Sequence, residues 1–214
     1  MPPSSFRAAP PVRLVCSDVE LDGAILRRRM CRSFLPGPVG ADALEHALFL
    51  ATHAPSAGNS QGWAFLVLEG EDTSLFWGQQ ADPGWLAHPS HPGLLNAAVV
   101  VLPLASRACY LERYSEPDKA APERVEQWQV PYWLVDTAFA TMLFLLGLAQ
   151  EGLGALFFAL RKPATPLLAE LGVPEDWQPI GAIAVGYPGT GDRPSLSAGR
   201  PRKSVDDVVH RGRW

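Results

Sequence analysis

Hydrophobic residues in this chain alternate between a helical period and short unbroken runs. After Asp42, which we interpret as an N-cap, apolar residues recur with the i, i+3, i+4, i+7 spacing of a helix. These residues are Leu44, Ala47, Leu48 and Ala51. The next run, residues 63–68, is apolar and rich in aromatic and branched side chains, which predicts a strand.

The same reading divides the rest of the chain into further elements. Apolar runs predict strands over 97–104, 155–160 and 180–187, and helices are expected over 19–31 and 163–171. Two segments lack such a pattern. Residues 70–95 are rich in turn formers, and residues 106–130 are charged and predict a surface helix and loop that form an excursion.

Residues 131–150 are apolar on nearly all sides, which leaves two interpretations. Their length approaches that of a transmembrane span. However, Asp136, Thr137 and Thr141 interrupt the segment, and no basic cluster lies close to its ends. We therefore favour a helix buried in the core or at a subunit interface.

The order of elements predicts a single layered domain. Residues 1–18 read as a flexible Pro-rich arm, and residues 19–214 as one domain. Helices and strands alternate without repeats, which favours helices packed on both faces of a sheet. This order alone leaves open whether the strands are parallel.

Composition narrows the possible partners and compartment. The 214 residues carry a net charge of −4, which argues against a general nucleic-acid or anionic-membrane binder. Cys16, Cys31 and Cys109 form no CxxC pair, so we expect free thiols in a reducing compartment. Residues 1–18 contain no long apolar core typical of a secretory signal. We expect a cytoplasmic protein.

The segment 54–63 (APSAGNSQGW) is the first candidate for chemistry. It lies between the predicted helix and strand, and it combines small residues with Ser56, Asn59 and Gln61. Such a loop can bring amide groups close to a flat ligand with polar edges. The alternative is an ordinary helix stop followed by a turn.

Two basic clusters, one near each end of the chain, are the second candidate. Arg28 and Arg32 are four residues apart and would share one face of the expected helix. Arg200, Arg202 and Lys203 lie near the C-terminus. Paired guanidinium groups suit a phosphate, although a solvated basic helix end is the alternative.

The sequence offers few catalytic side chains. His88 and His91 have no acidic or cysteine partner at metal-ligand spacing, so no metal is assigned. There is no GxSxG elbow, P-loop or GxGxxG after a strand, and the cysteines lack an evident base. We therefore expect a cofactor to carry any chemistry.

Several segments together resemble the FMN-dependent nitroreductase family. Residues 28–34 are in register with its basic N-terminal motif, and residues 54–63 match its flavin loop, Ala-Pro-Ser-x-x-Asn-x-Gln-Pro-Trp. Residues 152–154, 184–188 and 200–209 match in the same order. The resemblance extends from about residue 21 to the C-terminus.

This resemblance implies an α+β fold with three α/β/α layers, a mainly antiparallel central sheet and an interlocked homodimer with FMN sites at its interface. It assigns cofactor contacts to Arg28, Arg29, Arg32, Ser56, Asn59, Gln61, Phe157, Phe158, Ala159, Arg200 and Arg202. Hydride would pass from NADH or NADPH through flavin N5 to a small electron-poor acceptor, such as a nitroaromatic, quinone or enone.

The chain departs from the family pattern at three places. Met30 replaces the usual serine, Gly62 replaces the proline of the flavin loop, and residues 157–160 (FFAL) replace Pro-x-Glu-Gly. Two alternatives therefore stay open. One is a flavin-binding or ligand-sequestering module without reductase turnover, and the other is a relative with non-reductase flavin chemistry.

Overall fold

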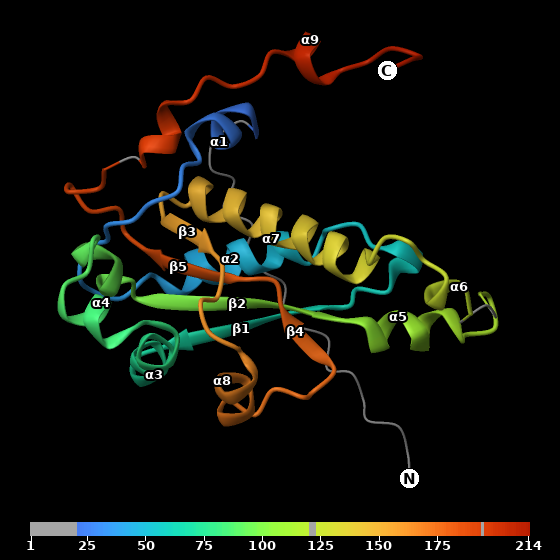
Figure 1. The fold of residues 1–214 in the computed structure, drawn as a ribbon, viewed down its shortest axis with the longest axis horizontal. Helices are drawn as coiled ribbons and strands as arrows, with labels where there is room; N and C mark the ends of the chain where they lie inside the picture. Colours follow the sequence, from blue (N-terminus) through green and yellow to red (C-terminus); the bar gives the residue numbers. More distant parts are fainter. Residues whose placement is uncertain (1–20, 120–122, 194) are drawn as a thin grey trace.

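An antiparallel sheet forms the centre of the computed structural model, which describes residues 21–119, 123–193 and 195–214. The expected arm over residues 1–18 lies outside the described residues. The strands are β1 (Trp63–Glu69), β2 (Val99–Ser106), β3 (Gly154–Phe158), β4 (Trp177–Pro179) and β5 (Ala182–Gly186). The order is β1-β2-β5-β3, with β4 paired to β2, and each pairing is antiparallel (Figure 1). The expected antiparallel sheet is confirmed.

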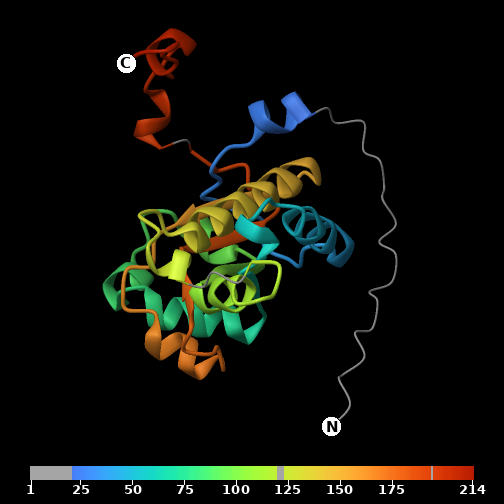
Figure 2. The same ribbon diagram turned by 90° about the vertical axis from the view of Figure 1, so that its right-hand side faces the viewer.

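Helices cover both faces of this sheet. On one face lie α2 (Ala41–Ala51) and α7 (Tyr132–Gln150), and on the other lie α3 (Glu71–Gln80) and α8 (Thr165–Glu170) (Figures 1 and 2). The expected α/β/α layering is therefore present.

The remaining helices are short and lie around this frame. They are α1 (Leu21–Arg27), η1 (Ala57–Asn59), α4 (Pro83–Ala87), η2 (Pro92–Asn96), α5 (Arg107–Tyr114), α6 (Glu123–Glu126), η3 (Leu196–Gly199) and α9 (Val205–Val208).

Strand β2 explains why the sheet needs two helical layers. All of its residues are buried, and alternate side chains enter opposite layers. Val99 and Val101 pack in the cluster formed with α2 and α7, whereas Val100 and Leu102 pack in the cluster formed with α3 and α8. An unbroken apolar strand is stable only where both faces are covered.

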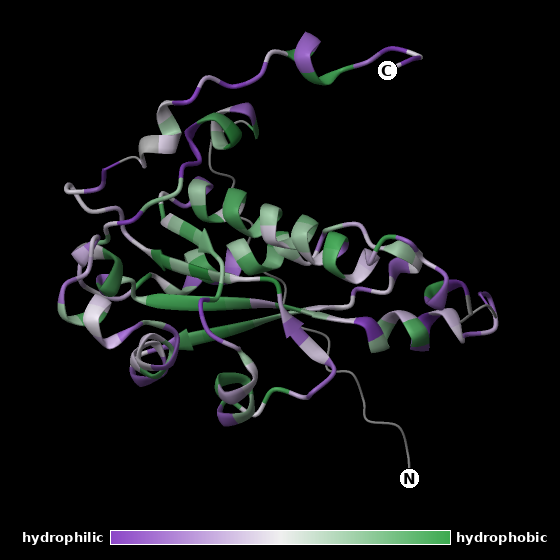
Figure 3. Ribbon diagram, viewed as in Figure 1, coloured by the Kyte–Doolittle hydropathy of each residue, from purple (hydrophilic) through white to green (hydrophobic). Residues whose placement is uncertain are grey.

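Helix α7 packs against the sheet through one face, and Figure 3 shows it as a largely hydrophobic helix that lies over the sheet. It is the one helix in the described ranges that is long and apolar enough to cross a membrane. Its inner face includes the fully buried Phe144 and Leu148, as expected for a core helix. The core covers only one face of this helix, since Phe139 is 48% exposed and Met142 is 40% exposed, and a subunit interface on the other face stays a prediction.

The expected helix over 19–31 is shorter than predicted. Helix α1 ends at Arg27, and the following segment is extended because it pairs with the edge of the sheet. The Cys31 amide donates to the Ala155 carbonyl at 2.8 Å, and Met30 forms a parallel bridge with Ala155. The prediction that Arg28 and Arg32 share a helical face is therefore wrong, since this long-range pairing overrides local helix propensity.

Two other local predictions need correction. Asp42 is in the first turn of α2, and the N-cap is Gly40, which makes no side-chain cap hydrogen bond. Asp42 therefore interacts favourably with the helix dipole but does not cap the helix. The turn-rich segment 70–95 contains α3, whose buried Phe76 and Trp77 anchor a helix of weak amphipathic pattern.

The packing around Gly62 predicts a specific cost for a side chain there. A Cβ at this position would lie 2.5 Å from the Tyr110 ring and 2.9 Å from the Ser106 carbonyl oxygen. We expect Gly62→Ala to lower the free energy of unfolding by about 1–3 kcal/mol, because neither neighbour is a flexible chain end.

Urea denaturation of Gly62→Ala beside Gly78→Ala measures this cost. A Cβ on Gly78, in α3, would meet no side chain or distant backbone atom within 4 Å. The control Gly78→Ala should therefore raise the free energy of unfolding by about 0.5–1 kcal/mol through its higher helix propensity. Equal stability of the two variants would contradict the packing argument.

Candidate cofactor site

A buried carboxylate holds the 54–63 loop in place. Asp136, in the first turns of α7, is 3% exposed and accepts from the Ala57 amide at 2.8 Å. It also accepts from the Tyr110 hydroxyl at 2.8 Å. Arg113 donates through Nε to the Gly58 carbonyl at 2.8 Å. The loop is thus fixed by α7 and by the α5 part of the 106–130 excursion.

The loop backbone is strained at two of the predicted contact residues. Asn59 and Gln61 have φ values of 55° and 48°, and no other non-glycine residue in the described ranges has a positive φ. Asn tolerates this region, whereas Gln adopts it rarely. Ser56 stabilises the turn by accepting from the Gln61 amide through its hydroxyl at 3.0 Å. The Asn59 and Gln61 side chains are exposed. Strain of this kind is concentrated at functional sites.

Asp192 fixes the other predicted element, the arginine segment after α1. Its carboxylate binds the Arg29 guanidinium and accepts from the Arg32 amide at 2.6 Å. Arg32 also donates through Nη1 to the Met30 carbonyl at 3.2 Å. Of the three predicted arginines, Arg29 is therefore already paired with a carboxylate.

Arg28 has an unmet hydrogen-bonding need. Its Nη1 atom is buried and has no hydrogen-bond partner within the described part of the chain. Arg28, Arg29, Arg32 and Arg202 line one cavity of about 320 Å³ together with Ser195 and Ser197. The structure thus brings basic residues from both ends of the chain to one place, whereas Arg200 is exposed and does not line this cavity.

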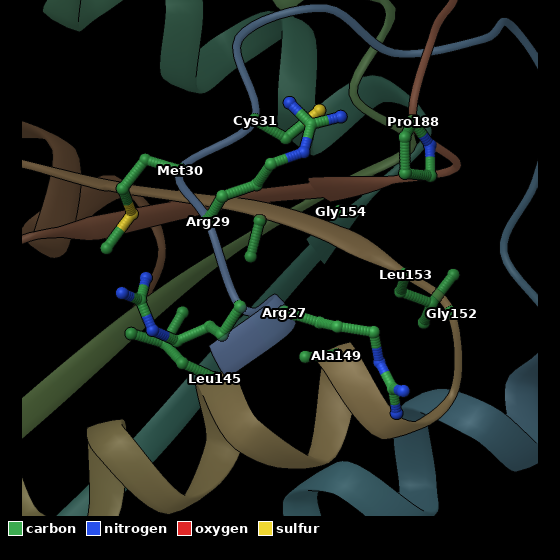
Figure 4. Close-up of a pocket in the computed structure, with 12 residues that line it drawn as sticks. Arg27, Arg29, Met30, Cys31, Leu145, Ala149, Gly152, Leu153, Gly154 and Pro188 are labelled. Carbon is green, nitrogen blue, oxygen red and sulfur yellow. The ribbon is translucent and has the colours of Figure 1, made fainter. Parts of the chain in front are cut away.

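A neighbouring cavity of about 230 Å³ lies between the arginine segment and the C-terminal end of α7. Figure 4 shows Arg29, Met30 and Cys31 on one side of it and Leu145 and Ala149 on the other. Arg28 and Arg29 line both cavities, so the two adjoin. Arg32 also lines a third cavity, of about 330 Å³, with Ser33, Ser90, His91 and Arg193.

This arrangement fits the phosphate of a flavin nucleotide. A buried guanidinium donor without a partner is costly unless an acceptor is supplied, and phosphate oxygens accept bidentate hydrogen bonds from arginine. The third cavity shares Arg32 with the basic cavity and is lined further along by Ser90 and His91, so there is space beyond the phosphate.

Within one chain, the residues of the 54–63 loop do not reach this basic cavity. The loop binds to Asp136, whereas Leu145 and Ala149 face the arginine segment. Leu145 follows Asp136 by nine positions, and the rise of about 1.5 Å per residue separates them by about 14 Å along the helix. The two halves of the predicted site therefore lie towards opposite ends of α7.

Residues 157–159 end strand β3 between the two layers. Phe157 packs with the α7 cluster, and its amide donates to the Met30 sulfur at 3.4 Å. Phe158 packs in the opposite layer, and Phe158 and Ala159 line a cavity separate from the basic one.

The sequence pattern missed the carboxylates that organise the site. Asp136 was noted only as an interruption of an apolar helix, and Asp192 was not singled out. A charged residue within an apolar helix was the available signal for Asp136, because such a group is retained where it is hydrogen-bonded. Asp192 gave no signal, since its partners are about 160 residues away in sequence.

Cys31 does not have the character of a nucleophile. It is 1% exposed, and burial raises the pKa of its thiol. This keeps the group protonated at neutral pH, in agreement with the sequence-based expectation.

Comparisons with known proteins agree with this geometry. The model of the nitroreductase family matches residues 25–187. A protein of Archaeoglobus fulgidus, provisionally named NADH dehydrogenase/NAD(P)H nitroreductase, is 25% identical over 193 residues, which are 89% of this chain and 96% of the relative.

Solved structures of the same family are similar in fold. The nitroreductase CinD from Lactococcus lactis, in complex with nicotinic acid, has a TM-score of 0.72 and 16% identity, with 91% of this chain and 100% of that chain covered. A nitroreductase family protein from Streptococcus pneumoniae has a TM-score of 0.70 and 18% identity, with 90% and 100% covered.

The Tyr110–Asp136 hydrogen bond predicts how stability depends on pH. Burial and the nearby carboxylate raise the pKa of Tyr110 above its ordinary value. Tyr110 therefore stabilises the fold fully below about pH 10, the ordinary pKa of the unfolded side chain, and this contribution is lost as the pH rises further. We expect Tyr110→Phe to lower the free energy of unfolding by about 1–3 kcal/mol at pH 7. Above pH 10, the stability of this variant should fall less steeply with pH than that of the wild type.

Urea unfolding between pH 8 and 11 tests this expectation. Tyr187→Phe is the matched control, because Tyr187 is 42% exposed. If Tyr110→Phe followed the wild-type slope, the buried hydrogen bond would not be the origin of the pH dependence.

Proposed function

The chain belongs to the nitroreductase family, and from this premise we propose that it is an FMN-dependent oxidoreductase. The observation that carries the proposal is Arg28, a residue that lines a cavity with Arg32 and Arg202 and whose buried Nη1 lacks a partner among the described residues. FMN bound there would accept hydride from NADH or NADPH and deliver it to a small electron-poor acceptor.

We assign the contacts with the FMN phosphate to Arg28, Arg32 and Arg202, which supply positive charge and hydrogen-bond donors. Arg29 supports this site indirectly, because its pairing with Asp192 holds the segment in place. Arg200 is exposed and does not line this cavity, so its predicted contact with the phosphate stays a prediction. The backbone around Phe157 to Ala159 would flank the ring.

Ser56, Asn59 and Gln61 would complete the site of a second copy of this chain. They lie towards the end of α7 remote from the basic cavity, and two of them are exposed. The outer face of α7, with Phe139 and Met142, and the tail residues Val205, Val208 and Val209 expose apolar area that a homodimer would bury. In both views the C-terminal segment extends away from the body (Figures 1 and 2).

The proposed acceptor is a nitroaromatic, quinone or enone. A second structure of CinD from Lactococcus lactis is in complex with 4-nitrophenol, at 16% identity and a TM-score of 0.71, which supports a small aromatic acceptor for this fold. We place the protein in the cytoplasm, where Cys31 and Cys109 would stay as free thiols.

Anaerobic mixing with NADH or NADPH tests the function. The FMN-loaded protein should lose its absorbance near 450 nm with one of the two nucleotides and regain it when a nitroaromatic or quinone is added. Bound FMN that neither nucleotide bleaches would identify a flavin-binding module without turnover. A colourless protein that takes up no added FMN would overturn every flavin-based reading.

The phosphate assignment is tested by FMN affinity in matched arginine variants. Arg28→Ala and Arg202→Ala should each weaken FMN binding by about 1–3 kcal/mol, the range for lost hydrogen bonds to charged groups. Arg124→Ala, at an exposed position on α6, is the control and should bind FMN as the wild type does. Unchanged affinity in both test variants would refute this assignment.

The homodimer is tested by placing a charge on α7. Phe139→Glu should yield monomers in sedimentation velocity and lose FMN affinity, because a buried unpaired carboxylate is incompatible with an apolar interface. The control is Ser74→Glu, at an exposed position on α3 in the opposite helical layer. A monomeric Phe139→Glu protein that binds FMN normally would show that one protomer forms a complete site.

A further inference from the structure

One face of helix α5 packs against the 54–63 loop. Tyr110, Arg113 and Tyr114 are three and four positions apart, so they lie on the same side of this helix. A Cβ on Gly62 would lie 2.5 Å from the Tyr110 ring. A Cβ on Gly58 would lie 2.9 Å from the Tyr114 ring. Helix α5 is therefore in close contact with both glycines of the loop.

Arg113 makes a directional contact between the helix and the loop. Its Nε donates to the Gly58 carbonyl at 2.8 Å, and its Nη1 and Nη2 each donate to the Asp118 carboxylate at 2.7 Å. Because the guanidinium is planar and rigid, the paired bonds to Asp118 fix the direction in which Nε points. The same pairing lowers the pKa of the Asp118 carboxyl, which therefore stays ionised at neutral pH. Arg113 thus holds the Gly58 carbonyl in one orientation.

The Gly58 carbonyl lies where the loop backbone is strained. Gly58, Asn59 and Gln61 have φ values of 64°, 55° and 48°, so three of four consecutive residues are left-handed. Glycine adopts this region freely and Asn tolerates it, whereas Gln adopts it at a cost in free energy. A backbone of this kind keeps its shape only where the surrounding contacts outweigh the strain.

Two other contacts hold the loop on either side of its left-handed residues. The Ala57 amide donates to the buried Asp136 at 2.8 Å, and the Ser106 amide donates to the Gly62 carbonyl at 2.9 Å. Arg113 binds between these two points. Its side chain is 21% exposed and that of Asp118 is 60% exposed. Replacement of Arg113 should therefore leave the core and both outer contacts in place.

We propose that Arg113 is a positioning residue for the cofactor site. Its hydrogen bond to the Gly58 carbonyl keeps Asn59 and Gln61 in the left-handed conformation in which the loop contacts FMN. This role rests on the proposed flavin function, and it explains why α5 belongs to the site. Without Arg113 the loop would relax, and only the fraction of molecules with the competent loop would bind FMN. The apparent affinity would fall in proportion to that fraction.

The first test measures the affinity of the full chain for FMN. Arg113→Met keeps an unbranched side chain and removes the donors, so FMN should bind about tenfold more weakly. Arg113→Lys keeps the charge, but one ammonium group cannot reproduce the planar fork, so FMN should bind at least about threefold more weakly. Arg124→Met, at an exposed position on α6, is the control and should bind FMN as the wild type does.

A double-mutant cycle separates positioning from a merely structural role. Gln61→Gly removes the cost of the left-handed backbone at this position, and it also removes a predicted FMN contact, so its own affinity is the reference. In the Gln61→Gly background, Arg113→Met should weaken FMN binding by less than about threefold, because the loop no longer has to be held against that strain. An arginine that acted in any other way would cause the same loss in both backgrounds.

The loop conformation is tested without FMN by the crystal structures of the flavin-free wild type and Arg113→Met proteins. We expect Gln61 to leave the left-handed region in the variant, whereas strands β1 and β2 should superpose on those of the wild type.

Three results would overturn the proposal. They are wild-type FMN affinity of Arg113→Met, an equal loss of affinity in the two backgrounds, and a positive φ at Gln61 in the flavin-free variant. If the wild type took up no FMN, the proposed function would fail, and with it the flavin role of Arg113. The crystal structure of Arg113→Met would still show whether this residue holds the loop, so the two failures are distinguishable.

Discussion

Helix α7 buries its inner face against the antiparallel sheet, and both halves of the candidate site lie along this helix. Near its start, Asp136 holds the strained loop through the Ala57 amide, and near its end, Leu145 and Ala149 face the arginine segment. Helix α7 therefore covers one side of the core and also separates the 54–63 loop from the arginine segment.

The buried carboxylates show how a mainly apolar chain positions polar groups. Asp136 is almost fully buried and is satisfied by one backbone amide and one tyrosine hydroxyl. Asp192 is likewise satisfied by the Arg29 guanidinium and the Arg32 amide. In each case a carboxylate from one segment fixes the backbone of another, because an unpaired buried charge would be strongly destabilising. These pairs place the site residues without themselves having to touch a ligand.

The local sequence pattern predicted most of the strands and the position of the candidate loop. Unbroken apolar runs identified β1, β2, β3 and β5 but not the short β4, and the loop motif identified residues that the structure holds in unusual backbone conformations. The sequence pattern gave wrong predictions where contacts between distant segments determine the local structure. The chain after Arg27 is extended because of Ala155, and α3 forms because Phe76 and Trp77 are buried against the sheet, although its own periodicity is weak. The partners of Asp136 and Asp192 could not be predicted for the same reason, since each contact joins segments that are distant in sequence.

Gly62 and Met30, which depart from the family pattern, have local physical explanations. A side chain at position 62 would collide with Tyr110, so Gly62 permits the close packing that ties the loop to α5. Met30 packs against both core clusters, and its sulfur accepts from the Phe157 amide. A thioether fills apolar space and accepts a weak hydrogen bond, whereas a serine hydroxyl would leave part of that space empty. Two of the residues that depart from the family pattern, Met30 and Phe157, therefore contact each other at the edge of the sheet.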